Sequence, residues 1–268
     1  MSDLVLYEQQ EHVVVITLNR PARHNALNWA LYDAATAAFK KANADSTVRC
    51  IVFTGAGPSF CSGDDIVEIM ATGNGLEDAL DKPRESPESA ATTSPPIAIA
   101  MRDSRCPIVV AVNGAAIGFG MELTLLGDIR LASEKAKFSE MFIRRGIIAT
   151  HISYDLLPNI VGSAAAAQLL LTGDMVGADE AKQMGLVSQV TKHNELLKTA
   201  IELSNRIAAN PPLATQRAKQ ALRLKRDNRI NELDPYLTAS LAALAKTQDH
   251  KESVSAFLEK RTGVYTGK

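Results

Sequence analysis

The clearest indication of the architecture lies in residues 108–122, which read IVVAVNGAAIGFGME. The run Ile108–Val112 is apolar and mostly β-branched, the pattern of a short strand that is buried on both faces. Three glycines follow it and allow the backbone to turn tightly and to approach a ligand closely. From about Met121 a helix is expected. A strand, a glycine-rich turn and a helix in this order indicate an α/β protein.

The same strand pattern recurs on both sides of this stretch. Short apolar runs lie at Val13–Leu18, Cys50–Phe53 and Ile129–Ala132. Between the first two, Asn28 is a suitable N-cap for a helix from Trp29 to about Asn43. Because short apolar strands that alternate with helices mostly pair in parallel, the expected fold class is α/β with a largely parallel sheet.

After Gly162 the strand pattern mostly disappears and helical segments follow. We expect helices at Ala164–Leu171, Ala178–Met184, Glu195–Ala209, Leu213–Lys225 and Asn231–Lys246. Pro211 and Pro212 separate two of them and mark a boundary to a helical C-terminal part. Earlier in the chain, Ala71–Pro96 is rich in Gly, Pro, Ser, Thr and Glu, which is typical of either a functional lid or a tolerant surface loop.

The composition excludes several classes of protein. The chain has 268 residues, of which 46% are hydrophobic and 22% charged, as in ordinary globular proteins. Its formal net charge of −1 provides no bulk attraction to nucleic acid or anionic lipid. The three cysteines, Cys50, Cys61 and Cys106, lack metal-site spacing. With no secretory pattern and no apolar run of bilayer length, we expect a cytoplasmic protein with reduced thiols, no membrane partner and no bound metal.

Two glycine-bearing loops are the expected place for chemistry. They are residues 59–66, after the second strand, and residues 113–122, after the third. A dinucleotide site is excluded because Gly114, Gly118 and Gly120 do not make G-x-G-x-x-G. Two separate loops, each able to direct one backbone N–H at the same oxygen, are better suited to an oxyanion hole.

Further motifs accompany these loops in order along the chain. They are Asn19-Arg20-Pro21 with Asn25-Ala26-Leu27-Asn28, Phe60-Cys61-Ser62-Gly63-Asp64-Asp65-Ile66, Pro107–Glu122, Asp128, Leu171-Thr172-Gly173, Gly185-Leu186-Val187 and Ser255–Arg261. Together they resemble the motifs of the crotonase family, also called the enoyl-CoA hydratase/isomerase superfamily. The match covers nearly the whole chain.

The resemblance implies a crotonase-like spiral of repeated β-β-α units over residues 1–205. Residues 206–268 would form a helical region that assembles homotrimers or dimers of trimers. The implied substrate is an acyl-CoA thioester, with coenzyme A as part of the substrate and no separate cofactor. Its carbonyl would accept hydrogen bonds from the backbone N–H groups of Asp64 and Phe119, and such donors stabilise an enolate.

Other positions match the family's contacts with coenzyme A and the acyl group. The CoA contacts would be Arg23, His24, Ser62, Asp65, Ile66 and Lys260, the last from a neighbouring subunit. The acyl pocket would include Phe142 and Thr150. For Arg23 and Lys260 the alternative is an ordinary exposed side chain.

Glu122 matches the first catalytic glutamate of the hydratases, directly after the glycine loop. The second glutamate of the hydratases is replaced here by Phe142. Glu140 lies two residues earlier and in an extended segment would share the face of Phe142, but its displacement favours a surface or supporting role. Several isomerases place an aspartate slightly further on, where this chain has Thr150.

His151 is the nearest alternative acid–base group, because imidazole titrates near neutral pH. Asp155, four residues later, could orient it as in a catalytic triad. Equally, the two could form a simple intrahelical ion pair. For Cys61, beside the first loop, a packing role is favoured over nucleophilic chemistry.

Three functional hypotheses follow. The first is hydration or dehydration of a 2-enoyl-CoA with Glu122 as the main acid–base group. The second is an enoyl-CoA isomerase or CoA-ester hydrolase in which Glu122 and His151 share the work. The third, of a different class, is a non-catalytic homologue that binds acyl-CoA, or RNA through the basic run Arg217–Arg229. The neutral net charge weighs against nucleic acid as a partner.

Overall fold

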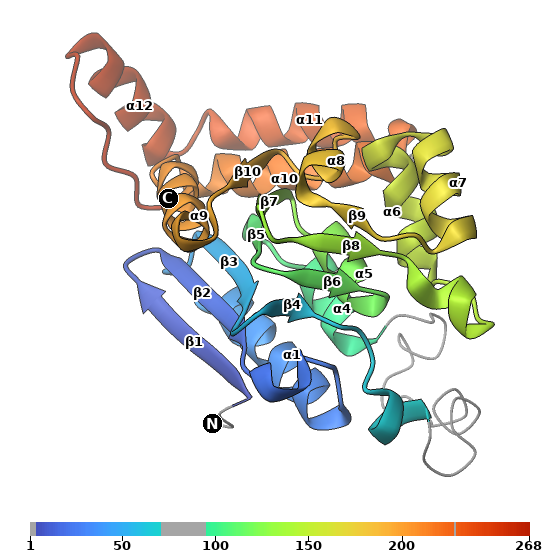
Figure 1. The fold of residues 1–268 in the computed structure, drawn as a ribbon. Helices are drawn as coiled ribbons and strands as arrows, with labels where there is room; N and C mark the ends of the chain where they lie inside the picture. Colours follow the sequence, from blue (N-terminus) through green and yellow to red (C-terminus); the bar gives the residue numbers. More distant parts are fainter. Residues whose placement is uncertain (1–3, 71–94, 228) are drawn as a thin grey trace.

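In the computed structural model, residues 4–70, 95–227 and 229–268 are described, and within these ranges the chain forms two sheets covered by helices (Figure 1). The first sheet has the strand order β1-β2-β3-β5-β7-β10. Its strands are β1 (Val5–Gln10), β2 (Val13–Leu18), β3 (Cys50–Gly55), β5 (Ile108–Val112), β7 (Ile129–Ser133) and β10 (Gln189–Thr191). Only the β1–β2 pair is antiparallel, and the other neighbours in this sheet pair in parallel. The predicted α/β class with a largely parallel sheet is therefore confirmed.

The second sheet is built from short strands in the order β4-β6-β8-β9. They are β4 (Ser59–Cys61), β6 (Ala115–Ile117), β8 (Lys137–Ser139) and β9 (Val176–Gly177). Strands β4, β6 and β8 each follow a strand of the first sheet after a few residues, so the chain steps repeatedly from one sheet to the other. These repeated strand–strand units form the expected spiral.

Helices fill the connections and form the C-terminal part. They are α1 (Trp29–Ala44), α4 (Pro96–Arg102), α5 (Phe119–Leu125), α6 (His151–Val161), α7 (Ser163–Thr172), α8 (Ala178–Gln183), α9 (Leu196–Ala208), α10 (Pro212–Arg226), α11 (Ile230–Leu244) and α12 (Gln248–Leu258). The shorter helical turns are η1 (Pro21–Arg23), η2 (Ile66–Met70), η3 (Met141–Arg145) and η4 (His193–Glu195). The predicted cap of α1 is confirmed, because the side chain of Asn28 accepts a hydrogen bond from Leu31 N at 3.0 Å.

The core lies on both faces of the first sheet. One face packs against α9, where Leu196 and Ala200 contact the buried valines of β2, β3 and β5. The other face carries the larger cluster, which includes edge-to-face contacts between the rings of Phe39, Phe53 and Phe60, with centroids 5.1 and 5.2 Å apart. Because both faces are buried, these strands consist of continuous apolar runs rather than alternating ones.

The expected division of the chain at residues 205 and 206 falls inside α9, which ends only at Ala208. α9 packs on the first sheet, and α10, α11 and α12 follow it along the chain. Figure 1 shows α12 projecting away from the body of the chain. Of the expected loop at residues 71–96, positions 71–94 lie outside the described residues, and Pro96 begins α4. Among the described helices, none is long and apolar enough to cross a membrane.

Candidate active site

The two glycine-bearing loops lie against each other. Gly63 has a φ of +88°, and a Cβ atom at this position would stand 2.8 Å from the carbonyl oxygen of Ile117 and 3.5 Å from the amide nitrogen of Phe119. Only a glycine allows this approach. The structure thereby brings the segment of Asp64, one predicted oxyanion donor, next to Phe119, the other.

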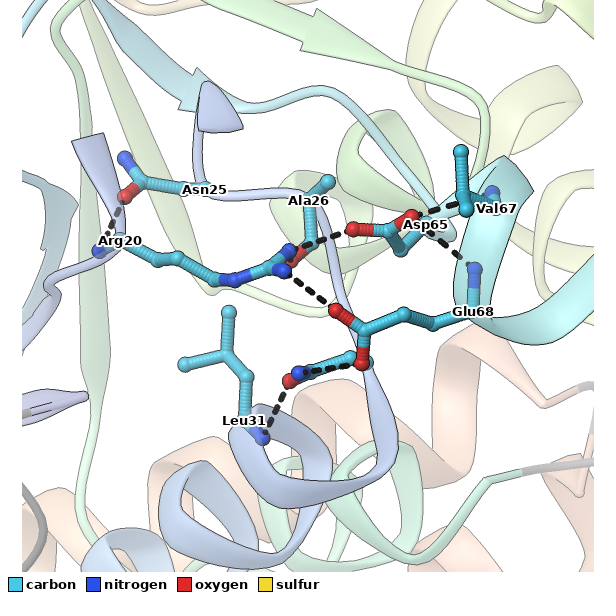
Figure 2. Close-up of polar contacts among 8 residues, drawn as sticks. Arg20, Asn25, Ala26, Leu31, Asp65, Val67 and Glu68 are labelled. Carbon is cyan, nitrogen blue, oxygen red and sulfur yellow. Dashed lines mark hydrogen bonds and ion pairs between the residues drawn. The ribbon is translucent and has the colours of Figure 1, made fainter. Parts of the chain in front are cut away.

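A cluster centred on Arg20 holds the first of these loops in place (Figure 2). The Arg20 guanidinium donates to Asp65 Oδ2 at 2.6 Å, to Glu68 Oε1 at 2.6 Å and to the carbonyl oxygen of Ala26 at 3.0 Å. Asn28, the cap of α1, donates to the other oxygen of Glu68 at 2.8 Å. We call Arg20, Asn28, Asp65 and Glu68 the Arg20 cluster. It ties the segment before α1 to the turn that follows Asp64.

Asn25 adds a buried link to the same loop. Its side-chain oxygen accepts from Arg20 N at 2.8 Å, and its side-chain nitrogen donates to Ser59 O at 2.8 Å and to Phe60 O at 3.1 Å. The side chain has 0% exposure. A buried amide that meets this many backbone groups fixes the path of the chain.

Asp65 is ionised within the Arg20 cluster. Although burial raises its pKa, hydrogen bonds from Arg20 and from the amides of Glu68 and Val67 bring the pKa below its usual value. Its carboxylate is engaged by these groups. A contact with coenzyme A, predicted for Asp65, would therefore involve its backbone.

The side chain of Asp64 turns toward α1. Tyr32 donates its hydroxyl proton to Asp64 Oδ1 at 2.5 Å, and the Tyr32 ring packs on that of Phe119 with centroids 5.7 Å apart. Burial raises the pKa of Asp64, and the hydrogen bond from Tyr32 partly offsets this. Phe119 is 3% exposed, and its ring is held in this contact with Tyr32.

Glu122 lies in the first turn of α5 and has 0% exposure. Its carboxylate accepts from Thr150 N at 2.9 Å, from the Thr150 hydroxyl at 3.0 Å and from the Ser153 hydroxyl at 2.9 Å. Burial raises its pKa to about 7, against the lowering effect of these hydrogen bonds. A buried carboxyl group with a pKa near neutrality is suited to general acid–base catalysis.

Glu140 is a second buried carboxyl group beside Glu122. It is 1% exposed, and its Oε1 lies 2.8 Å from the Ser153 hydroxyl oxygen. Burial raises its pKa to about 8, and the charge of Glu122 contributes. We call Glu122, Glu140, Thr150 and Ser153 the Glu122 cluster. Of the two roles expected for Glu140, the structure excludes the surface position.

The other acid–base candidates lie at the start of α6. His151 is the first residue of the helix and half-buried, whereas the side chain of Asp155 is exposed. Thr150, expected to shape the acyl pocket, caps α6 by accepting from Ile152 N at 3.2 Å and donates to Glu122. A triad of His151 and Asp155 stays a prediction.

An apolar cavity of about 350 Å³ opens between η3, α6 and α7. Phe142 and Glu140 line it, together with Ile148, Tyr154 and Leu171. The Phe142 ring also reaches the turn before α5, since a Cβ atom on Gly118 would stand 3.7 Å from it. The cavity therefore borders the Glu122 cluster, and Phe142, a predicted acyl-pocket residue, is part of its wall.

The predicted CoA contacts fall into two regions. Arg23 and His24 lie on the exposed turn η1, and the His24 ring contacts the Ser59 hydroxyl at 2.9 Å. Ser62 N donates to His24 O at 3.1 Å, so this turn and the first loop are adjacent. Ile66 is 52% exposed. Lys260 follows α12, which projects from the body of the chain (Figure 1).

Two further expectations concern residues outside this site. Burial raises the pKa of the Cys61 thiol to about 12, which agrees with packing rather than nucleophilic chemistry. In the basic run of α10, Lys219 is 6% exposed, pairs with Asp128 at 2.9 Å and donates to Cys106 O at 2.7 Å. Part of that run is therefore internal structure rather than a surface for RNA.

Among the described residues, no group of three or more His, Cys, Asp or Glu side chains is arranged to hold a metal ion.

Several residues that the structure places around the site cannot be identified from the sequence alone. Ser153 gave no signal because its importance depends on Glu140, which lies thirteen residues away. From the sequence, Tyr32 is recognisable only as part of a helix. In the sequence, Arg20 and Asn25 stand out only as parts of a motif, although the two acidic residues Asp65 and Glu68, three positions apart, suggest a basic partner.

Two sheets joined by a spiral chain, with two glycine loops beside a buried glutamate, define an α/β enzyme of the crotonase fold. The family model for enoyl-CoA hydratase/isomerase matches residues 8–268. The chain therefore belongs to the enoyl-CoA hydratase/isomerase family.

Individual relatives agree with this assignment. The chain is 34% identical over 268 residues to a 2,3-dehydroadipyl-CoA hydratase of Escherichia coli K12, with 100% of both chains covered. It is 33% identical over 270 residues to a 1,2-epoxyphenylacetyl-CoA isomerase of the same organism, again with 100% of both covered. Among solved structures, an enoyl-CoA hydratase from Bacillus anthracis has a TM-score of 0.86 at 30% identity, covering 99% of this chain and 100% of the other.

Proposed function

We propose that the protein binds an acyl-CoA thioester, stabilises its enolate with the backbone N–H groups of Asp64 and Phe119, and moves protons with Glu122. The preferred reaction is the addition of water to a 2-enoyl-CoA and its reversal. The observation that carries the proposal is the buried Glu122 carboxyl group, whose pKa of about 7 lets it accept and return a proton near neutral pH.

The positions of the two loops support the same reaction. Two amide donors directed at the thioester oxygen would lower the energy of the developing enolate by several kcal/mol. Gly63 and Gly118 allow the backbones of the two loops to approach each other. Glu122 lies one helical turn after Gly118. The acid–base group and one of the two oxyanion donors, Phe119, thus come from one short segment, residues 118–122, and the other donor, Asp64, comes from the first loop.

The apolar cavity beside the Glu122 cluster is the proposed site of the acyl group. Its wall is built from Phe142, Ile148 and Leu171, and Tyr154 contributes a polar edge. Coenzyme A would extend from the loops toward the exposed turn of Arg23 and His24. Arg23 would then supply a local positive charge for a ligand that is a polyanion.

Isomerisation of an enoyl-CoA is the second candidate, favoured by one observation. Phe142 stands where hydratases carry a second glutamate, and its ring forms an apolar wall. A shift of the double bond needs one base that removes a proton and returns it to another carbon. Glu122 alone could do this, with His151 as the second candidate group.

The test is a panel of 2-enoyl-, 3-enoyl- and β-keto-acyl-CoA compounds, including crotonyl-CoA, analysed by mass. Mass separates addition of water from chain cleavage, and the chromatographic separation of 2-enoyl- from 3-enoyl-CoA detects isomerisation, which leaves the mass unchanged. Deuterium uptake from D₂O at the α-carbon of butyryl-CoA reports enolate formation without a full reaction. We expect Glu122→Gln to lower turnover by about 10²- to 10⁴-fold.

Two control variants separate the hypotheses. Glu202→Gln changes a glutamate that is 62% exposed and should leave turnover unchanged. His151→Ala should lower turnover strongly only if His151 shares the acid–base work. If Glu122→Gln retains full turnover and full deuterium exchange, the proposed role of Glu122 is wrong.

A further inference from the structure

The Ser153 hydroxyl contacts two buried carboxyl groups at once. Its oxygen lies 2.9 Å from Glu122 Oε1 and 2.8 Å from Glu140 Oε1, and all three side chains are at most 1% exposed. A serine hydroxyl has one proton and can donate it to only one of them. The other contact is a hydrogen bond only if that carboxyl group is protonated and donates to the serine oxygen.

The remaining contacts show which carboxyl group carries the proton. Glu122 accepts from the amide and the hydroxyl of Thr150 in addition to Ser153, and hydrogen bonds of this kind favour the ionised form. Glu140 has no such support, and its Oε2 is buried without a hydrogen-bond partner among the described residues. An ionised oxygen left in that position would be costly. The proton therefore belongs on Glu140.

We propose that Glu140, as a neutral carboxylic acid, is the positioning residue of Glu122: it donates to Ser153 and thereby holds the Ser153 proton on the Glu122 carboxylate. This inference rests on the proposed role of Glu122 as the acid–base group. It gives this chain a second carboxyl group in its site, although Phe142 occupies the position of the hydratases' second glutamate. Glu140 acts through Ser153, and no contact with substrate is required.

The proposed hydrogen bonds between Glu140, Ser153 and Glu122 persist only while Glu140 is protonated. When Glu140 loses its proton, two carboxylates compete for one hydroxyl proton and repel each other. Burial and the charge of Glu122 raise the pKa of Glu140, whereas the hydrogen bonds from Thr150 and Ser153 favour the ionised form of Glu122, so Glu122 ionises first as pH rises. The charged and titratable groups on the neighbouring elements are Tyr32 on α1, Asp64 on the first loop, Arg144 and Arg145 on η3, and His151, Tyr154 and Asp155 on α6. Turnover should therefore rise with pH as Glu122 ionises and fall again as Glu140 ionises.

The decisive variant is Glu140→Gln, because an amide cannot ionise and can still donate to Ser153. We expect its turnover of the best CoA thioester in the panel to stay within about threefold of the wild type at neutral pH. Its pH profile should keep the acidic limb and lose the alkaline limb. Glu140→Leu, which cannot donate, should lower kcat by about tenfold or more with little change in KM. Ser204→Ala changes another buried serine and is the matched control for the Ser153→Ala variant used below.

Two measurements complete the test. Infrared spectra at neutral pH should show a protonated carboxyl band that is weaker in Glu140→Gln, because only the contributions of other carboxyl groups such as Glu122 remain, whether or not a substrate is known. Ser153→Ala should abolish the difference between Glu140→Gln and Glu140→Leu, since the bridge is gone.

The proposal is overturned if the alkaline limb persists unchanged in Glu140→Gln, or if the infrared band is equally strong in the wild type and in Glu140→Gln. It is also overturned if Glu140→Gln and Glu140→Leu have the same kcat while Ser153 is present. If Glu122→Gln has full activity, the proposed function itself fails. If Glu122→Gln is inactive and the Glu140→Gln profile is unchanged, only this inference fails.

Discussion

The Arg20 cluster and the Glu122 cluster use the same acidic side chains in opposite ways. In the Arg20 cluster a guanidinium is shared by Asp65 and Glu68, and the pKa of Asp65 lies below its usual value. In the Glu122 cluster no cation contacts the carboxyl groups among the described residues, and burial raises the pKa of Glu122 to about 7 and of Glu140 to about 8. The first arrangement fixes the backbone with permanent charges. The second keeps two carboxyl groups able to gain or lose a proton near neutral pH.

The largest effect is expected from breaking the Arg20 cluster. Arg20→Met leaves Asp65 buried without its cation, which should lower the free energy of unfolding by about 3–5 kcal/mol. Because Asp64 adjoins Asp65, turnover should fall as well. Urea unfolding and turnover of a CoA thioester measure both effects.

Two variants sharpen this prediction. Arg229→Met removes an ion pair with Glu232 in which both side chains are 54% exposed, and should cost less than about 1 kcal/mol. The double variant Arg20→Met, Asp65→Asn should recover part of the lost stability, because no buried charge remains. A loss no greater than that of Arg229→Met would contradict the assigned role of Arg20.

The next effect concerns stability against pH in the Glu122 cluster. Glu140 titrates near 4.5 in the unfolded chain and at about 8 in the folded protein. Between these values the folded state binds more protons, so its free energy of unfolding falls as pH rises, by roughly 2–4 kcal/mol from Glu140. Glu140→Gln lacks this contribution. Urea unfolding between about pH 5 and about pH 9 should therefore show the variant gaining stability relative to the wild type as pH rises. Parallel curves for the two proteins would count against a raised pKa of Glu140.

A smaller change is expected from Thr150→Val. The variant loses the hydroxyl donor to Glu122 and keeps the amide donor, so the pKa of Glu122 should rise further, by about half a unit to one unit. The acidic limb of the pH–rate profile should shift upward accordingly, with a loss of about two- to fivefold in turnover at neutral pH. Thr150→Ser retains the hydroxyl and is the matched control. An unshifted limb in Thr150→Val would show that this hydroxyl does not stabilise the ionised form.

The smallest effect is expected from Tyr32→Phe. The hydroxyl of Tyr32 binds the Asp64 side chain, whereas the proposed function uses the Asp64 backbone N–H. Turnover should remain within about threefold, and stability should fall by about 1 kcal/mol. Tyr236→Phe, which removes a 3.3 Å hydrogen bond to Arg217 O, is the control. A large loss of turnover in Tyr32→Phe would assign the Asp64 side chain to the chemistry.

The strands that were predictable from sequence are those with both faces buried. β2, β3 and β5 are mostly apolar and almost fully buried. β7 contains Arg130 and is only partly buried, but its apolar residues still identify it. β1 was missed because most of its residues are exposed or partly exposed. The strands of the second sheet have two or three residues each, too few for any periodicity.

The candidate site was predictable where it depends on local backbone. Gly63, Gly118 and Glu122 lie within short segments whose residue order suggests their role. The Glu122 cluster was not predictable from sequence, because Glu140 and Ser153 are recognisable only by their contact with each other and with Glu122 on α5. These residues come together only in the tertiary structure, and no single stretch of the sequence contains them all.

The distribution of these groups along the chain also has a consequence for folding. Arg20 and Asp65 are 45 residues apart, and Glu122 and Ser153 are 31 residues apart. Contacts between such distant residues form late, since the intervening loops must close first. On refolding, helix and sheet signals should therefore recover before enzymatic activity does, and recovered activity should mark completion of the whole core.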